Sequence, residues 1–110
     1  MDKSQAIDAL HALAQETRLD VFRLLVRQGE AGMAAGEISE FLGVKQNTMS
    51  ANLAVLSRAG LVRSEREGRV IRYFADFEGM RNLLAFLMED CCGGNPDLCK
   101  PVLDEIACAC

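Results

Sequence analysis

The sequence has no apolar run that approaches the length of a membrane span. Its start, MDKSQAIDALHAL, mixes acidic with apolar residues, unlike a signal peptide. We therefore expect a cytoplasmic protein with no membrane partner. It has a single histidine, His11, and a lone histidine is more often solvated or hydrogen-bonded than a ligand. Cysteine is absent from the first 90 residues, so the expected core does not use it as a small apolar side chain.

An excess of positive charge is also lacking. The 110-residue chain has a formal net charge of −4, which at face value argues against nucleic acid as a partner. The charge is unevenly distributed, because residues 45–72 carry a net +4 and the rest of the chain a net −8. Half of the residues are apolar, enough for one folded domain over residues 1–110. We expect a basic, phosphate-facing segment on an acidic body that helps to orient the protein on a duplex.

Residues 37–61, EISEFLGVKQNTMSANLAVLSRAGL, have the pattern of two short helices joined by a tight turn, a helix-turn-helix. Gly43 offers the positive φ that ends the first helix, and Gly60 closes the second in the same way. The second helix has an apolar stripe of Met49, Leu53 and Leu56. Between these lie short hydrogen-bonding side chains suited to reading base edges in a major groove: Gln46, Asn47, Thr48, Ser50 and Asn52.

Two helices are predicted before this segment. The first spans residues 4–14 after a Ser4 cap, with one stripe made of Ile7, Leu10, Leu13 and Ala14. Thr17 is the expected cap of the second, which ends at Gly29 and has a predicted buried face of Leu19, Phe22, Leu25 and Val26. The small-residue segment 30–36 shows no periodicity, so we interpret it as a connector that leads into a helix starting near Ala35.

After Leu61 the pattern changes from helical period to alternation. Residues 62–66 and 69–74 read as two strands around a turn at Glu67-Gly68, which predicts a β-hairpin. Arg66 and Arg69 flank its tip, where they could reach a phosphate or the adjacent minor groove. A solvated hairpin with ordinary arginines is the alternative, but its position directly after a helix-turn-helix favours a DNA-binding wing over residues 62–74.

The helical period returns from Gly79 in a segment that is apolar over more than one face. Its apolar residues are Met80, Leu83, Leu84, Phe86, Leu87 and Met88. One face can cover the core of its own subunit and the other can pair with a copy of itself. We therefore predict a homodimer through a helix over residues 79–92, with help from the first helix. A fully buried central helix in a monomer is the alternative.

Four stretches resemble the ArsR/SmtB family of winged-helix metal-sensing repressors: ALAQETRLDVFRLL at 12–25, the region of Ser50 and Leu53, GLV at 60–62, and REGR at 66–69. The resemblance covers residues 5 to 90 and implies a homodimer that binds its operator when free of ligand and leaves it when a metal or metalloid binds. Family members with a thiol site in the helix-turn-helix have cysteines where this chain has Ala34 and Gly36. Asn52 stands where many relatives have histidine.

All five cysteines lie in residues 91–110, a predicted cysteine-rich tail. Cys91 and Cys92 are adjacent, and Gly93, Gly94 and Pro96 end the helix so that the chain can turn back and bring Cys99 over the pair. Three thiolates without a nearby histidine form a sulfur-only site, whereas zinc usually takes four ligands in C-x₂₋₄-C spacing. Trivalent arsenic or antimony takes three thiolates in a pyramid. Similar sites in arsenite-sensing relatives agree with this interpretation.

Several readings stay open at this point. Cys108 and Cys110 could add a fourth ligand for cadmium, lead or zinc, could pass metalloid to the main site, or could belong to a tail without a role. The thiols could instead form a redox or persulfide sensor in which Cys91 or Cys92 pairs with Cys99. Two weaker alternatives are a thiol reductase and a protein-interaction module with a helix-turn-helix shape but no DNA target.

The sequence as a whole predicts a mostly α-helical (α+β) winged helix-turn-helix homodimer that is not an enzyme. The expected effector is arsenite, or else antimonite, held by Cys91, Cys92 and Cys99, with no organic cofactor. The expected partner is double-stranded operator DNA. The predicted DNA contacts are Lys45, Gln46, Asn47, Thr48, Ser50, Asn52, Arg66 and Arg69.

Overall fold

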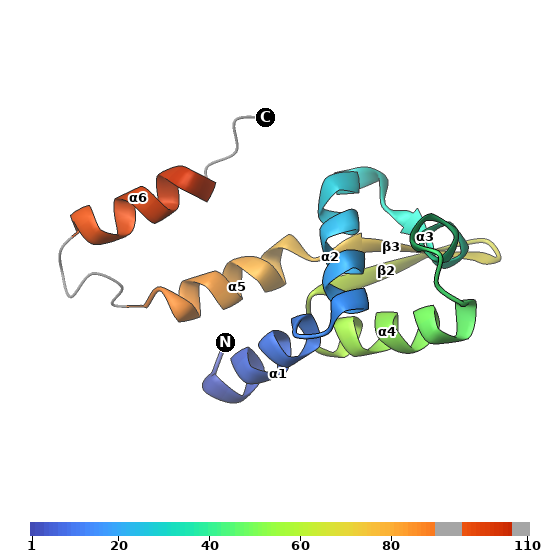
Figure 1. Cartoon of the computed structure of the whole chain (residues 1–110), viewed down its shortest axis with the longest axis horizontal. Helices are drawn as coiled ribbons and strands as arrows, with labels where there is room; N and C mark the ends of the chain where they lie inside the picture. Colours follow the sequence, from blue (N-terminus) through green and yellow to red (C-terminus); the bar gives the residue numbers. More distant parts are fainter. Residues whose placement is uncertain (90–95, 107–110) are drawn as a thin grey trace.

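The computed structural model describes residues 1–89 and 96–106. Over these ranges the chain is mostly helical with one small antiparallel sheet (Figure 1). In chain order the elements are α1 (Lys3–Leu13), α2 (Glu16–Gln28), the short 3₁₀ helix η1 (Gly29–Ala31), β1 (Met33–Ala34), α3 (Ala35–Leu42), α4 (Gln46–Arg58), β2 (Val62–Glu67), β3 (Val70–Ala75), α5 (Phe77–Leu87) and α6 (Pro96–Ile106). The predicted winged helix-turn-helix fold is confirmed.

Helix α1 begins and packs differently from the prediction. Its cap is Asp2, not Ser4: the Asp2 carboxylate accepts from the Gln5 N–H at 2.8 Å, and the Gln5 side chain accepts from the Asp2 N–H. The buried face consists of alanines (Ala6, Ala9 and Ala12), while Ile7 is 57% exposed and Leu10 is 43% exposed. Small side chains let α1 lie close to the core, and its larger apolar residues therefore face outward.

Helix α2 is also rotated relative to the prediction. Gln15, not Thr17, is the cap, and its side chain accepts from the Arg18 N–H at 2.8 Å. The buried residues are Val21, Phe22, Leu24 and Leu25, whereas Leu19 and Val26 are exposed. Gly29 ends the helix at a φ of 56°, as predicted.

The helix-turn-helix follows the sequence pattern closely. Gly43 adopts the left-handed conformation at the end of α3, with φ 66° and ψ 34°, and Gly60 has a φ of 78° after α4. Met49, Leu53 and Leu56 on α4 are at most 1% exposed. They pack with α1, α2 and α3 in a single core cluster, so α4 is fixed along one whole side.

The sheet has three strands in the order β1-β3-β2. The hairpin partner pairs run from Val62 with Ala75 to Glu67 with Val70, which leaves Gly68 and Arg69 as a two-residue loop. The turn therefore lies one residue later than predicted. The segment interpreted as an unstructured connector contains β1, whose Met33 and Ala34 pair with Tyr73 and Arg72 of β3. A two-residue strand is too short to show alternation.

Helix α5 starts at Phe77 and ends at Leu87, not at 92. Asp76 caps it by accepting from the Gly79 N–H at 3.1 Å. Leu83 is buried, and Met80 and Phe86 pack partly against the core, while Leu84 and Leu87 are 41% and 48% exposed. The two apolar faces predicted for this helix are therefore present.

The tail contains a further helix, α6, which was not predicted. Pro96, expected to prevent the preceding helix from continuing, is also the first residue of α6, where its missing N–H is not needed. Four large apolar side chains of α6 are more than 40% exposed: Leu98, Val102, Leu103 and Ile106. Within the described ranges, no helix is long and apolar enough to cross a membrane.

Candidate nucleic-acid interface and cysteine cluster

Four polar side chains at the start of α4 are open to solvent. Gln46, Asn47, Thr48 and Ser50 are all exposed, and we call these four residues the reading face. They lie within the first five residues of α4, so they project from its N-terminal end. In helix-turn-helix proteins this is the part of the second helix that contacts base edges.

The N-terminus of α4 is open to an anionic partner. Its cap residue, Lys45, is exposed and makes no side-chain capping bond, and the first turn contains no acidic residue. The Thr48 N–H is bound locally, by the Asn47 side-chain oxygen at 2.8 Å. Unoccupied N–H donors, the positive end of the helix dipole and the Lys45 ammonium together suit a phosphate group.

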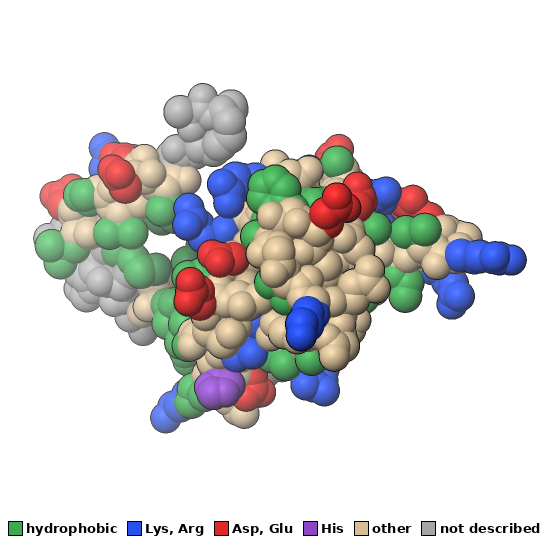
Figure 2. Space-filling view, turned by 45° about the vertical axis from the view of Figure 1, so that its right-hand side comes forward, with side chains coloured by type: hydrophobic (Ala, Val, Ile, Leu, Met, Phe, Trp, Pro, Cys, Tyr) green, Lys and Arg blue, Asp and Glu red, His purple; other side chains and the backbone are tan. Residues whose placement is uncertain are grey.

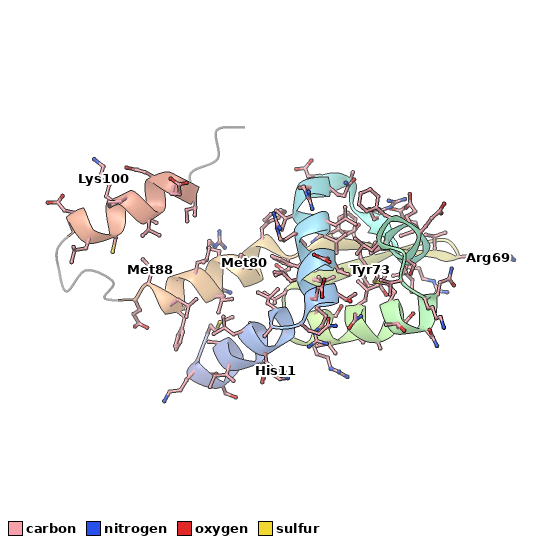
Figure 3. All side chains as sticks on the ribbon, in the orientation of Figure 1. His11, Arg69, Tyr73, Met80, Met88 and Lys100 are labelled. Atoms are coloured by element: carbon pink, nitrogen blue, oxygen red, sulfur yellow. The ribbon has the colours of Figure 1, made fainter. Side chains whose placement is uncertain are left out.

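The wing places two arginines at its outer end. Arg69 belongs to the two-residue loop at the tip (Figure 3), and the Arg66 Nε donates to the Gly68 carbonyl at 3.1 Å. Figure 1 shows that the wing tip and the N-terminal end of α4 lie at the same end of the molecule, and Figure 2 shows Lys and Arg side chains projecting there. Within residues 1–89 and 96–106, no carboxylate pairs with Lys45, Arg66 or Arg69.

The basic segment 45–72 does not form one patch, which corrects the prediction. Arg63 pairs with Glu65 at 2.9 Å and lies over the Phe74 ring, 4.3 Å from its centroid. Arg58 is at the far end of α4 and lines a pocket that is also lined by acidic residues of α1 and α5. These two arginines therefore add little positive charge to the end with the reading face.

Arg72 has a structural role on the sheet. It pairs with Glu67 at 3.3 Å and Glu37 at 3.7 Å, and it donates to the carbonyls of Ala31 and Gly32 at 3.4 Å. Glu37 in turn accepts from the Ala34 N–H at 2.9 Å, where it caps α3. Arg72 thus joins the wing to the start of the helix-turn-helix, a role that its position in an alternating strand could not reveal.

Asn52 lies on the inner side of α4, apart from the reading face. It is 8% exposed, and its Oδ1 accepts from the Arg18 Nη1 at 3.4 Å. The structure therefore removes Asn52 from the predicted set of groups that can meet base edges. Arg18 was not predicted to be a functional residue. Its position just after a predicted helix start is the one sequence signal that could have indicated it.

The cysteine cluster is described in part. Cys91 and Cys92, together with Cys108 and Cys110, lie outside the described residues. Cys99 lies on α6, is 5% exposed and is disulfide-bonded. The described residues contain no group of three His, Cys, Asp or Glu side chains that could hold a metal ion. The three-thiolate site stays a prediction.

Comparison with known proteins identifies the family. A family of helix-turn-helix domains matches residues 13–65. HlyU of Vibrio cholerae, a transcriptional activator, has a structure that is 32% identical, covers 79% of this chain and 97% of its own, and superposes with a TM-score of 0.63. Mb0332 of Mycobacterium bovis, a homodimeric winged helix-turn-helix DNA-binding domain and candidate ArsR-family regulator, is 34% identical over 77% of this chain and 76% of its own, with a TM-score of 0.65.

A third relative is the candidate arsenical resistance operon repressor ArsR of Halobacterium salinarum. It is 34% identical over 79 residues, which cover 72% of this chain and 60% of that protein. The reading face, the arginine-tipped wing and these relatives agree on one assignment. The chain belongs to the ArsR family of winged helix-turn-helix, DNA-binding transcriptional regulators.

Proposed function

We propose that this protein is a homodimeric repressor that binds a palindromic operator and is released from it when trivalent arsenic binds Cys91, Cys92 and Cys99. One observation carries the proposal. The surface suited to DNA, at the N-terminus of α4 and the wing tip, is separate in the chain from the cysteines, which all follow α5. We therefore expect effector and DNA to bind at different residues, so that each influences the other through the protein, as in a ligand-controlled repressor.

The homodimer is supported by an apolar surface on α1 and α5. These helices contact each other, and Ile7, Leu10, Leu84 and Leu87 on them are each between 41% and 57% exposed. We call these four residues the dimer face. Pairing two copies through it would bury apolar surface that is otherwise in water and would place two reading faces on one duplex. Mb0332, which has the same fold, is a homodimer.

Arsenic fits the donor set because the three candidate ligands are all thiols. Arsenous acid condenses with three thiols, so that three As–S bonds form, three As–O bonds break and three water molecules leave. The oxidation state of arsenic does not change. Antimonite can react in the same way. The reaction consumes thiols, so Cys99 must first be released from its disulfide, and the protein must be reduced before arsenic can bind.

The effect on DNA binding has a defined scale. A ligand shifts the affinity for DNA only by its differential affinity for the two forms of the protein, and such coupling is commonly about 1–3 kcal/mol, or roughly 5- to 150-fold. We expect arsenite to weaken operator binding within this range. A transcription assay with and without arsenite would establish whether the protein represses or activates transcription. We propose repression, although the relative HlyU is an activator.

The test is a titration of the operator complex of the reduced protein, followed by fluorescence anisotropy of labelled DNA. Arsenite, antimonite, cadmium, zinc and hydrogen peroxide are added separately. We expect release by arsenite, and loss of that release in Cys91→Ser, Cys92→Ser and Cys99→Ser proteins that still bind DNA. Cys108→Ser and Cys110→Ser are the matched controls and should respond as the wild type does. Normal release of the Cys92→Ser protein by arsenite would refute the site.

A second candidate function is a thiol–disulfide switch, which the disulfide at Cys99 favours. Oxidation of two thiols by one molecule of hydrogen peroxide forms one disulfide and two molecules of water, with the two electrons passing to the peroxide. This function needs two cysteines and no metalloid. It predicts release by peroxide, reversal by dithiothreitol, and loss of the peroxide response in Cys99→Ser while arsenite has no specific effect on the wild type.

A further inference from the structure

Arg18, at the start of α2, joins three helices of the core. Its Nε donates to the Ala12 carbonyl of α1 at 2.7 Å, and its Nη1 donates to Asn52 Oδ1 of α4 at 3.4 Å. Both bonds are partly buried. The Ala12 carbonyl is one of the last four of α1, which have no partner within their own helix, and a cation is favoured at that negative end of the dipole.

Asn52 is suited to hold Arg18 and unsuited to meet DNA. It is one of two buried polar side chains in the described part of the chain, and it sits in the apolar stripe of α4 with Met49, Leu53 and Leu56. A polar group buried there needs a partner, and the Arg18 guanidinium supplies a charge-assisted one. The pair therefore connects the inner side of the DNA-reading helix to the C-terminal end of α1.

Helix α1 also carries half of the dimer face, through Ile7 and Leu10, less than two turns before Ala12. In a two-fold dimer the position of α1 relative to the axis is fixed by that contact. The distance between the two copies of α4 then depends on how each α4 is held against its own α1. Operator half-sites must be spaced to match the two reading helices, about one helical turn of DNA apart.

We propose that Arg18 and Asn52 are positioning residues that set the half-site spacing the dimer accepts, without themselves touching DNA. This rests on the homodimer of the proposed function. Loss of the pair frees α4 to shift relative to α1, so that the dimer tolerates operators of the wrong spacing. The contacts within each half-site, made by the reading face and the wing, are unchanged.

The experiment uses a palindromic duplex that the wild-type protein selects from random DNA. This duplex is rebuilt with the half-sites one or two base pairs closer or farther apart, and separately with single base changes inside a half-site. Affinities of the full-length protein are measured by fluorescence anisotropy. We expect Asn52→Leu and Arg18→Gln each to reduce the preference for the selected spacing by about threefold or more, since residues within one hydrogen-bond network are commonly coupled at that level. Preferences among bases should stay as in the wild type.

Two further variants make the test specific. Asn52→Asp keeps an acceptor for Arg18 and adds charge, so it should retain the wild-type spacing preference, whereas a carboxylate facing DNA would sharply weaken binding. Arg27→Gln is the matched control on the same helix, because within the described residues Arg27 donates only to the Arg23 carbonyl of α2, at 3.4 Å. It should leave the spacing preference unchanged.

Each outcome decides the proposal. It is overturned if Asn52→Leu changes base preference while the spacing profile is kept, which would make Asn52 a base contact. A lower melting temperature in both pair variants with an unchanged spacing profile also overturns it, because the pair would then serve only stability. A wild-type protein without any spacing optimum refutes the dimeric operator itself, and that result is visible before any variant is made.

Discussion

Replacing Gly79 by alanine tests how closely α5 packs against the end of α4. Gly79 is the third residue of α5, and an ideal Cβ built on it overlaps the Gly60 carbonyl oxygen and lies 3.0 Å from the carbonyl carbon. The Gly60 atoms are backbone atoms of the turn after α4, and the next residue, Leu61, accepts from the Asp76 N–H at 2.8 Å. No side-chain rotation can relieve this overlap, so α5 or the turn must move.

The magnitude follows from two opposing effects. Overpacking of this kind destabilises by about 1–3 kcal/mol, occasionally more. Alanine is favoured over glycine within a helix by up to about 1 kcal/mol, which offsets part of the loss. We therefore expect Gly79→Ala to lower the free energy of unfolding by about 1–2 kcal/mol, and to lower the melting temperature by about 4–8 °C per kcal/mol in a domain of this size.

Gly36→Ala is the matched control, because Gly36 also lies in the first turn of a helix. A Cβ at Gly36 meets only the Gln46 Nε2, at 3.9 Å, so this variant should equal the wild type or exceed it by up to about 1 kcal/mol. Urea and thermal unfolding, followed by circular dichroism at fixed protein concentration, measure both variants. Equal stability of Gly79→Ala and Gly36→Ala would refute the close packing of α5 on the turn after α4.

Three further predictions address DNA binding, stability and assembly. Arg69→Ala should weaken DNA binding about equally for all sequences and should lower the slope of log affinity against log salt concentration by about 1. Arg63→Ala, which removes a guanidinium paired with Glu65, should change that slope less. Equal slopes for both variants would contradict the role of the wing tip. Ser39→Ala should preserve or raise stability by about 1 kcal/mol, because the buried Ser39 Oγ has no hydrogen-bond partner in the described structure, and a clear loss in urea unfolding would reveal one. Leu84→Glu should shift the protein from dimer to monomer in sedimentation velocity while α-helical content is retained, and a persistent dimer would place the interface elsewhere.

Local sequence signals were sufficient for the elements whose ends depend on one residue. Gly29 and Gly43 marked helix ends because a positive φ is easily adopted only by glycine. The hairpin followed from alternation around a glycine turn, with an error of one residue at its tip. The exposed side chains at the start of α4 were also predicted, because Gln46, Asn47, Thr48 and Ser50 are polar side chains around the buried Met49.

The same signals failed where the answer depended on a distant partner. Strand β1 exists because β3 offers it two residues to pair with, and nothing within residues 30–36 indicates this. Asn52 has the composition of a base-reading residue, but Arg18, 34 positions away, makes it an internal one. Helix α6 was missed because Pro96 was considered only as a barrier to the preceding helix, although a proline is equally at home in the first turn of a new helix.

The sequence by itself determined the order of the helices and hairpin strands up to α5, the helix-turn-helix with its wing, and the clustering of five cysteines in the last 20 residues. These features depend on residue spacing and backbone preference, which are local. Only the tertiary structure decided which face of each helix is buried: alanines pack α1 against the core, so that Ile7 and Leu10 stay outside for a partner. It also separated the arginines that hold the wing together from Arg66 and Arg69, because ion pairs form between residues that the fold brings together, whatever their separation in sequence.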